Sequence, residues 1–399
     1  MSNTPKSALL SRPLLLLMAT SIAATAANLY YNQPLLPSIQ TTFELGDGAV
    51  GMIPSATQLG YAAAILLISP LGDVMSRRSL IGYLSILLTL ALLAVFAAPG
   101  FTALAVAFFA VGLGANITQQ LLPIGASLAA PARKGAVMGT LMTGLTVGIL
   151  LSRTVSGTIA EYFGWRSVFL VAAGLAALFG ILLRVNLPDN KPKISLSYPA
   201  LIASMFGLIR RHGLLRESVL TGALWFAAFN ALWATLAIHV TEAPFSYSVQ
   251  QAGMFGLVGM AGIIGAKLAG RLVDRFGPAR IITVALGLVV SSFVVLAIWG
   301  NSLTGLVVGI ILLDIGVFGA QIPNQVRVFS IDPDAQSRMN AVYMLGYYLA
   351  AAVGSALGVK VMSVAGWYGM ALFGFGLASM ALIHHLWRNE AARERHSPT

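Results

Sequence analysis

The segment Gly270-Arg271-Leu272-Val273-Asp274-Arg275-Phe276-Gly277-Pro278-Ala279-Arg280 is a short, charged, glycine-bounded turn between two long apolar runs. A reduced copy of it lies upstream, at Ser69-Pro70-Leu71-Gly72-Asp73-Val74-Met75-Ser76-Arg77-Arg78. Asp274 follows Asp73 by 201 residues, which is about half of the 399-residue chain. The turn and its copy therefore point to a duplicated unit.

Two further echoes support the duplication. The pair Gly164-Trp165 returns as Gly366-Trp367 after 202 residues, and Pro131 returns as Pro333 after the same interval. Repeated offsets of one size indicate an internal repeat, with one copy in each half of the chain.

The composition is that of a membrane protein. Hydrophobic residues make up 57% of the chain and charged residues only 9%, whereas a soluble domain carries about 25% charged residues. A transmembrane helix needs about 20 apolar residues, so the length allows about twelve spans with short loops. The apolar runs are continuous rather than alternating, which favours helices over a β-barrel.

Polar segments divide the apolar runs into twelve predicted spans. The first half contains 13–39, 49–71, 79–98, 102–129, 136–160 and 166–186, and the second half contains 217–241, 249–270, 281–300, 303–329, 339–361 and 367–387. We therefore predict an all-α membrane protein with twelve transmembrane helices in two pseudo-symmetric six-helix bundles. The bundles occupy 1–186 and 217–399, and a cytoplasmic linker occupies 187–216.

The net charge of +11 reflects the distribution of Lys and Arg among the loops. Most of the 24 basic residues fall on one side of the predicted membrane, and the opposite loops carry Glu44, Asp47, Glu161 and Glu242. The positive-inside rule then predicts that both termini are cytoplasmic, in a multi-pass protein of the lipid bilayer. No basic patch interleaved with aromatic residues is present, so the sequence predicts no nucleic-acid partner.

Two segments need separate interpretation. Ala24-Thr25-Ala26 resembles a signal-peptide cleavage site, but the apolar run continues to about Ile39, too far for a signal peptide. We interpret it as an uncleaved first span, which the repeat also requires. In the linker, Pro199 to Arg211 is predicted to form an amphipathic helix on the cytoplasmic face, with a plain solvated linker as the alternative.

The opening turn resembles the loop signature of the major facilitator superfamily of secondary transporters, roughly G-x-L-a-D-R-x-G-R-[RK]. In that superfamily it joins the second and third helices and often recurs between the eighth and ninth. The downstream copy matches at Gly270, Leu272, Asp274, Arg275, Gly277 and Arg280, and the upstream copy keeps Leu71, Asp73, Arg77 and Arg78. The resemblance implies the major facilitator fold. It also implies that Asp73 and Asp274 meet the N-termini of the eleventh and fifth helices, in a gating set made of Asp73, Arg77, Arg78, Gly270, Asp274, Arg275 and Gly277.

The predicted fifth helix carries Gly135, Gly144 and Gly148, small residues that allow close helix approach. This pattern resembles the glycine-rich fifth-helix motif of antiporter branches, although Ile149 stands where that motif has proline. Two readings stay open and can hold together: Gly144 and Gly148 serve ordinary packing, or they form a pivot between the halves.

Ionisable residues inside spans are functional hypotheses by default because burying them is costly. Asp314 is the one acid deep in a predicted span, near the midplane, and Arg153 has a similar depth in the fifth helix. Asp314 is either permanently paired for packing or a proton carrier, and Arg153 is its partner or a substrate anchor. We interpret His239 as an interfacial histidine, with a proton role as the weaker alternative. Lys267 and Lys360 lie near span ends, where their ammonium groups can reach water.

Other proton sites that are familiar in the superfamily are missing. Phe109 stands where many drug–proton members have an arginine in the fourth helix, and the first span contains no acid. If transport is coupled to protons, Asp314 is the best candidate carrier.

The resemblance implies a central cavity lined by the first, fourth, seventh and tenth helices. Polar and aromatic residues recur on those four helices, which would suit a small amphipathic solute. The alternative is hydrogen bonding between helices together with aromatic rings that face lipid. The candidate cavity residues are Asn28, Tyr31, Asn32, Asn116, Gln119, Gln120, Trp225, Phe229, Asn230, Trp233, Phe318 and Gln321.

No Walker loop, catalytic triad or metal-ligand spacing stands out, so we predict neither an enzyme nor a cofactor. The leading interpretation is a proton-coupled exporter of a small amphipathic compound that works by alternating access, as a monomer in a bacterial inner membrane. Uptake or facilitated diffusion of a small metabolite is the alternative within transport. A membrane sensor or scaffold is the remote alternative, and a polar cavity open to one side would count against it.

Overall fold

The computed structural model describes residues 10–46, 48–130, 133–189, 197–332 and 335–394. Within this part of the chain all regular structure is helical. The N-terminal half contains the helices α1 (Arg12–Ala27), η1 (Gln33–Leu35), α2 (Leu36–Thr42), η2 (Ala49–Gly51), α3 (Met52–Leu67), α4 (Leu71–Val74), α5 (Arg77–Ala97), α6 (Phe101–Gly114), α7 (Ile117–Leu128), α8 (Lys134–Phe163) and α9 (Trp165–Asn186).

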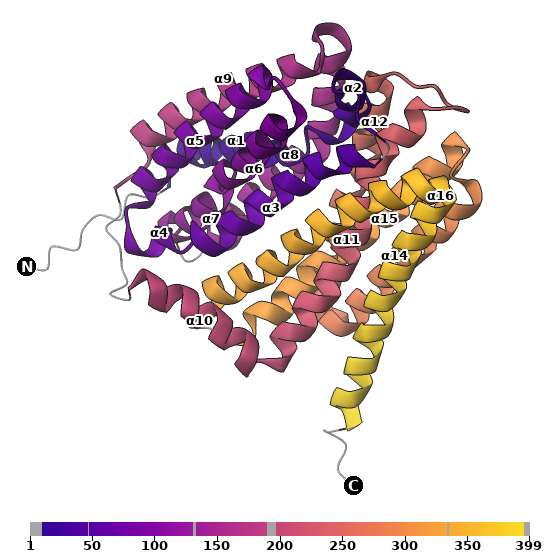
Figure 1. The fold of residues 1–399 in the computed structure, drawn as a ribbon. Coiled ribbons are helices and arrows are strands. Elements are labelled where there is room, and N and C mark those ends of the chain that lie inside the picture. Colours follow the sequence, from indigo (N-terminus) through magenta and orange to yellow (C-terminus); the bar gives the residue numbers. More distant parts are fainter. Residues whose placement is uncertain (1–9, 47, 131–132, 190–196, 333–334, 395–399) are drawn as a thin grey trace, which may run out of the picture.

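The linker and the C-terminal half are also helical. They contain α10 (Tyr198–Arg211), α11 (Gly213–Thr241), α12 (Val249–Gly259), α13 (Ala261–Phe276), α14 (Pro278–Trp299), α15 (Leu303–Phe329) and α16 (Gln336–Glu394). Figure 1 shows two helical bundles side by side, with α10 crossing from one to the other at one end. We call that end, where α4 and α10 lie, the linker end, and we call the opposite end the far end.

The twelve predicted spans are confirmed. Ten segments of the described chain are long and apolar enough to cross a membrane. One of them, within α16, joins two helices across a kink at Gly366. The shorter apolar helix α1 continues through η1 and α2 to supply the remaining span. Helices begin or end several residues beyond some predicted limits, for example at Gly213 and Phe276.

The duplication is visible in the backbone. Gly164 (φ 80°) and Gly366 (φ 65°) each adopt a left-handed conformation immediately before a tryptophan that starts the last helix of its bundle. Such backbone favours glycine because a Cβ would clash. Trp165 then donates to Thr42 Oγ1 and Trp367 donates to the carbonyl of Leu296, so both indoles tie the far end of their bundles.

The two charged turns differ in conformation. Gly277 (φ 79°) ends α13 and donates its N–H to the carbonyl of Val273. Ser76 holds the corresponding place upstream with φ −59°, and the chain there is extended before α5 begins. The upstream copy can therefore do without the glycine because its backbone does not enter the left-handed region.

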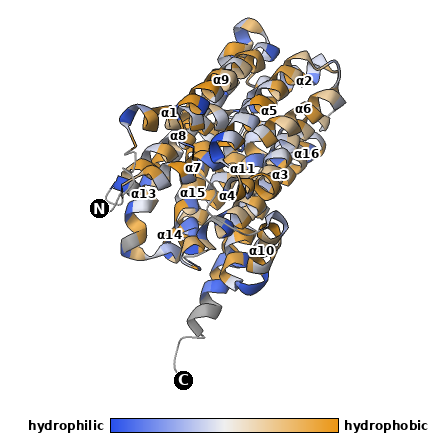
Figure 2. Cartoon of the chain, turned by 90° about the vertical axis from the view of Figure 1, so that its left-hand side faces the viewer, coloured by the Kyte–Doolittle hydropathy of each residue, from blue (hydrophilic) through white to orange (hydrophobic). Residues whose placement is uncertain are grey.

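The outer surface is that of a protein in lipid. Figure 2 shows hydrophobic residues along the helices, with hydrophilic residues more frequent near the helix ends. Large apolar side chains such as Tyr83, Val106 and Ile298 are more than 60% exposed. Lys267 and Lys360 are exposed as well, in agreement with their expected positions near span ends.

Glycines set the closest helix contacts inside each bundle. A Cβ at Gly144 or Gly148 would lie 2.4 or 2.3 Å from a backbone oxygen of α1, at Ala19 and Ala23 respectively. Gly354 in α16 meets Ala227 of α11 in the same way. The pivot reading of Gly144 and Gly148 is therefore corrected: both pack against a helix of their own bundle, and the glycine of α8 that reaches the other bundle is Gly157.

The predicted linker helix is confirmed as α10. Its buried side chains Leu201, Met205 and Leu208 share one face, while Arg210 and Arg211 occupy its last turn. The Tyr198 hydroxyl donates to the carbonyl of Leu67 in α3, at 2.5 Å. Burial raises the pKa of the Tyr198 phenol. The helix thus contacts both halves of the molecule at the linker end.

Replacing Gly148 by alanine should lower the melting temperature of the detergent-purified protein. The new Cβ would press on the Ala23 carbonyl oxygen, and overpacking of this kind costs about 1–3 kcal/mol. Gly139→Ala is the matched control in the same helix, because nothing lies within 4 Å of its Cβ position. Equal melting temperatures for the two variants would contradict this account of α1–α8 packing.

Candidate functional site

The side chain of Arg153 lies at the contact between the bundles. It projects from α8, is 1% exposed, and places its guanidinium carbon 3.9 Å from the ring centroid of Trp233 on α11. Its Nε donates to Gln33 Oε1 at 2.7 Å, and one terminal nitrogen donates to the carbonyl of Ile149 at 3.1 Å. An arginine stacked on an aromatic face gains a cation–π attraction that is stronger when the site is dry.

Asp314 lies on α15, beside the same tryptophan. It is fully buried, and neither carboxylate oxygen has a hydrogen-bond partner among the described residues. The position that a Cβ would take at Gly259 is 3.2 Å from Asp314 Oδ1 and 3.0 Å from Trp233 Cζ2. Asp314 and Arg153 interact electrostatically, but the part of the chain that the structure covers shows no salt bridge between them.

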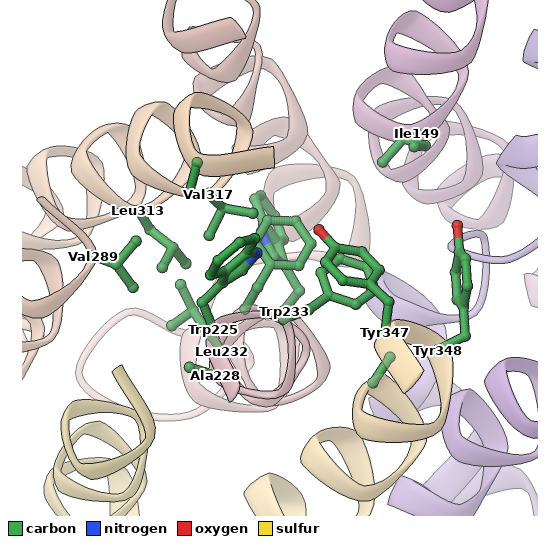
Figure 3. Packing of buried hydrophobic residues seen from close by; sticks show 14 of the residues in the cluster. Ile149, Trp225, Ala228, Leu232, Trp233, Val289, Leu313, Val317, Tyr347 and Tyr348 are labelled. Carbon is green, nitrogen blue, oxygen red and sulfur yellow. The ribbon is translucent and has the colours of Figure 1, made fainter. Parts of the chain in front are cut away.

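Aromatic rings surround the two charges. Phe229 contacts Trp233 and Phe318, with ring centroids 6.2 and 6.1 Å apart, and Arg153 also faces Tyr30 and Phe229. Figure 3 shows Tyr347 and Tyr348 of α16 on the side of the core that faces the helix carrying Ile149. Trp225, Phe229 and Trp233 are at most 2% exposed, so none of these predicted cavity rings faces lipid.

The predicted cavity residues of the first helix lie inside the N-terminal bundle. Asn28 lines a small hollow with Ser85 and Gly180 inside the N-terminal bundle, which corrects its assignment to the central cavity. Tyr31 belongs to the hydrophobic core of that bundle, and Asn32 donates to Thr57 Oγ1 of α3 at 3.0 Å.

The residues of this segment that do reach Arg153 are Tyr30 and Gln33, which sequence analysis missed. The α-helix ends at Ala27, so the spacing rule for a shared helix face fails from Asn28 onward. Two neighbouring tyrosines and a glutamine before Pro34 give no signal of which side chain points across the interface.

The fourth-helix candidates form a polar network at the linker end of the N-terminal bundle. Asn116 bonds to Ser69, Gln120 donates to Asn116, and Gln119 donates to the Tyr61 hydroxyl at 3.1 Å. Arg77 extends the network by donating to Gln120 Oε1 at 3.4 Å. These amides connect the charged turn to the interior of the bundle.

The remaining candidates lie in the C-terminal bundle. Asn230 is buried, donates to the Phe226 carbonyl of its own helix, and leaves its side-chain oxygen without a partner among the described residues. Phe318 packs against Phe229, and Gln321 accepts from the Tyr343 hydroxyl at 2.9 Å. Asp314, Trp233 and Phe229 therefore stand with Arg153, whereas Gln321 lies with Tyr343.

The gating candidates lie at the linker end. Asp73 pairs with Arg77 at 2.6 Å, and both line a cavity of about 100 Å³ that Arg338 and Asn340 of α16 also line. Arg78 donates to the carbonyl of Arg184. In the other turn Gly270 has open space around it and Arg275 lies over Phe276. The side chain of Asp274 lies outside the described residues.

A second buried charge cluster was not predicted. Glu217 at the start of α11 forms a salt bridge with Arg327 of α15, and Arg388 lies 3.6 Å from the same carboxylate. His385 is fully buried beside them and bonds to the Ala279 carbonyl. The sequence pattern places Arg327 near a cytoplasmic span end, but α15 is helical through Phe329 and its basic last turn packs inward.

His239 is buried at the far end, bonds to the carbonyl of Gly300, and stacks on Trp367 with ring centroids 3.9 Å apart. This arrangement agrees with the interfacial interpretation. A separate cavity of about 460 Å³ lies between α5 and α9, lined by Gly82, Ser85 and Gly180. Within the searched, described residues there is no group of His, Asp and Glu that could hold a metal ion.

The bundles meet most closely at the far end. Ser55 of α3 donates to the Ala352 carbonyl at 2.7 Å, and Thr154 of α8 donates to the Gly253 carbonyl at 3.0 Å. A Cβ at Gly157 would lie 3.0 Å from the Cα of Gly253. The structure is thus closed at the far end, while the cavity that holds Asp73 and Arg77 lies between the bundles and α10 at the linker end.

Comparisons with known proteins agree with this architecture. The sequence model of the Major Facilitator Superfamily matches residues 16–332. The chain is 38% identical over 383 residues to an uncharacterised transporter, YgaY, of Escherichia coli O157:H7, covering 95% of this chain and 96% of that protein. It is 33% identical over 361 residues to a probable transporter, SCO4007, of Streptomyces coelicolor, covering 90% and 84%.

Solved structures share the fold. A bacterial homologue of the human lysosomal transporter Spinster, in an inward-facing and occupied conformation, superposes with a TM-score of 0.74 at 15% identity over 96% of this chain and 98% of that one. A point mutant of the nucleoside transporter NupG gives a TM-score of 0.76 at 14% identity over 93% and 99%.

Glu217→Gln should lower the melting temperature strongly. Removing one partner of a buried ion pair leaves Arg327 uncompensated, which typically costs about 3–5 kcal/mol. Asp73→Asn is the matched control, because the Asp73–Arg77 pair is partly exposed, at 24% and 20%, and such pairs contribute about 0–1 kcal/mol. The ranking is measured by thermal unfolding in detergent, and a larger loss for Asp73→Asn would refute it.

Proposed function

Because this chain belongs to the major facilitator superfamily, it is a transmembrane transporter rather than an enzyme, and we propose that it exports a small amphipathic compound in exchange for protons. The observation that carries the proposal is the position of Asp314. It is a fully buried acid at the bundle contact, without a hydrogen-bond partner among the described side chains and backbone groups.

Asp314 would couple the proton to the movement of the bundles. An ionised carboxylate is expensive to carry through a dry, occluded state, and protonation removes that cost. Protonation also changes the attraction between Asp314 on α15 and Arg153 on α8. A ligand or proton that favours one arrangement of two bundles shifts the population toward it.

Alternating access would be a rocking movement of residues 1–186 against residues 217–399, with residues 187–216 as the linker. The far-end contacts Ser55–Ala352 and Thr154–Gly253 would open while the linker end closes. By the positive-inside rule the linker end is cytoplasmic, so both termini lie inside and the described conformation is open inward. The named relatives are bacterial, which supports the inner membrane as the location.

The solute would bind between the bundles, against the rings of Trp233, Phe229 and Phe318. Rings and a few polar groups in one site suit an amphipathic solute. The cavity between the bundles is lined by Asp73, Arg77 and Gln119, and a polar opening of this kind supports a transporter over a scaffold. One chain contains both bundles, so we take the monomer as the functional unit.

Asp314→Asn should permit solute exchange but abolish accumulation driven by a pH gradient, because the amide mimics the protonated acid permanently. Amphipathic compounds are first screened for transport in inside-out vesicles with and without a pH gradient. The variant is then compared in proteoliposomes with the compound found. Asp314→Glu keeps a titratable group and is the matched control. Accumulation by the Asn variant under an imposed pH gradient would show that Asp314 is not the proton carrier.

Crosslinking the far end should stop transport. The Cβ position of Gly51 lies 2.8 Å from the Cβ of Val359 across the bundles. This is closer than the roughly 3.5–4.5 Å between the Cβ atoms of a disulfide, so the two helices need to part only slightly for the bond to form. The chain has no cysteine, so Gly51→Cys with Val359→Cys can be oxidised without background. Transport should return on reduction, and each single variant serves as a control. Unchanged transport by the oxidised double variant would exclude a gate at this contact.

A further inference from the structure

The two charges at the bundle contact share a property that proton coupling alone does not explain. Each keeps free hydrogen-bonding capacity although each is at most 1% exposed. Arg153 Nη2 and both carboxylate oxygens of Asp314 have no partner among the described residues. Buried charges are normally paired or fully hydrogen-bonded, since leaving them open costs free energy.

Unpartnered hydrogen-bonding atoms are not a general feature of the buried charges in this protein. Glu217 and Arg327, on α11 and α15, pair directly, and Arg388 adds a second contact to the same carboxylate. Arg153 and Asp314 face the same indole ring but do not pair. This contrast indicates that the unpartnered polar atoms of Arg153 and Asp314 are available to bind a ligand.

The free donors belong to Arg153 and to the glutamine bonded to it. Gln33 accepts from Arg153 Nε through its Oε1, which leaves the Gln33 amide nitrogen as a second buried donor without a partner among the described residues. Arg153 Nη2 and Gln33 Nε2 are therefore free donors on two side chains that are bonded to each other. Two donors, one of them on a cation, match an acidic group such as a carboxylate.

The acceptors belong to Asp314. The Cβ position of Gly259 lies 3.2 Å from Asp314 Oδ1 and 3.0 Å from Trp233 Cζ2, so the carboxylate is beside the indole. Both of its oxygens, like the neighbouring indole N–H of Trp233, are without a partner among the described residues. A charged carboxylate in this place is best satisfied by a donor that carries positive charge, such as an amino group. Phe229, Trp233 and Phe318 supply the apolar surface between and around the two ends.

We propose that the transported compound is amphoteric: its acidic group binds Arg153 and Gln33, its amino group binds Asp314, and its apolar body packs on Trp233 and Phe229. This inference rests on the proposed transport function and names the substrate class of the same site. Both buried charges gain a partner when the compound binds, which reduces the cost of closing the site around it. The amino group and a proton compete for Asp314, as exchange of the compound for protons requires.

Matched compounds can test the proposal in the detergent-purified, full-length protein at fixed pH. One set is phenylalanine, 2-phenylethylamine and 3-phenylpropionate, and a second is tryptophan, tryptamine and indole-3-propionate. Each set keeps the ring and changes only the charged groups. The amphoteric member should bind about tenfold or more tightly than either relative, because it adds a charge-assisted hydrogen bond at each end. Dissociation constants follow from the shift of melting temperature with concentration.

Two variants test which charged group of the compound each residue binds. Arg153→Gln should bind the amphoteric compound no better than the amine, and Asp314→Asn should bind it no better than the acid. Arg166→Gln is the matched control, because Arg166 also stacks on a tryptophan, at 4.6 Å from the Trp165 ring, but bonds to Phe96 and Ala98 in its own bundle. It should keep the wild-type preference.

Gln33→Leu keeps both charges and covers the case in which Arg153→Gln does not fold. It should weaken binding of the amphoteric compound and of the acid by the same factor, and leave the amine unchanged. Equal affinity for amine and amphoteric compound in the unmodified protein, no binding in either set, or an unchanged preference in both the Arg153 and Gln33 variants would overturn the proposal. Amphoteric binding without any pH-driven accumulation would instead overturn proton coupling alone.

Discussion

The stacking of Arg153 on Trp233 is the interaction on which the centre of the molecule depends. It joins the two bundles through a charge that is fully withdrawn from water, with a guanidinium carbon 3.9 Å from the indole centroid. A cation buried in this way is stable only while the ring, Gln33 and the Ile149 carbonyl surround it. Any movement that separates α8 from α11 must therefore provide other partners for that charge, or let water reach it.

The close contacts elsewhere make such an exchange of partners feasible. Lipid is as apolar as the helices, so helix association in a membrane relies on packing and hydrogen bonds rather than on a hydrophobic effect. Inside a bundle, glycines such as Gly148 and Gly354 bring backbones into contact, which makes each bundle a rigid unit. Between the bundles, glycines again bring backbones together at the far end: a Cβ at Gly253 or Gly256 of α12 would lie 2.5 or 2.7 Å from the carbonyl oxygens of Arg153 and Leu150 of α8. Hydrogen bonds from Ser55 and Thr154 to carbonyls of the other bundle accompany them. Rocking of the bundles must break these contacts, and among the described residues no salt bridge holds them.

The sequence predicted the order of the spans because continuous apolar runs alternate with charged turns, although helices such as α11 and α13 extend several residues beyond the predicted limits. It also identified Arg153, Asp314 and Trp233, since charges and indoles inside spans are rare enough to be conspicuous. It missed Tyr30 and Gln33 because α1 ends at Ala27, and the helical periodicity used to place side chains stops there. It missed the Glu217–Arg327 pair because both residues lie near span ends, where hydropathy does not distinguish a solvated charge from one that packs inward.

The duplication shows why Arg153 and Asp314 lie on different bundles, on either side of the interface between them. A shift of 202 residues relates Asp314 to Gly112, and Arg153 to Ser355. Gly112 packs against the backbone of Thr57, and Ser355 is buried, so neither half contains both members of the pair. The halves have thus diverged in complementary ways, with the cation on one bundle and the acid on the other. The separation of the two charges consequently depends on how the bundles sit against each other, and any ligand that bridges the charges must act on that arrangement.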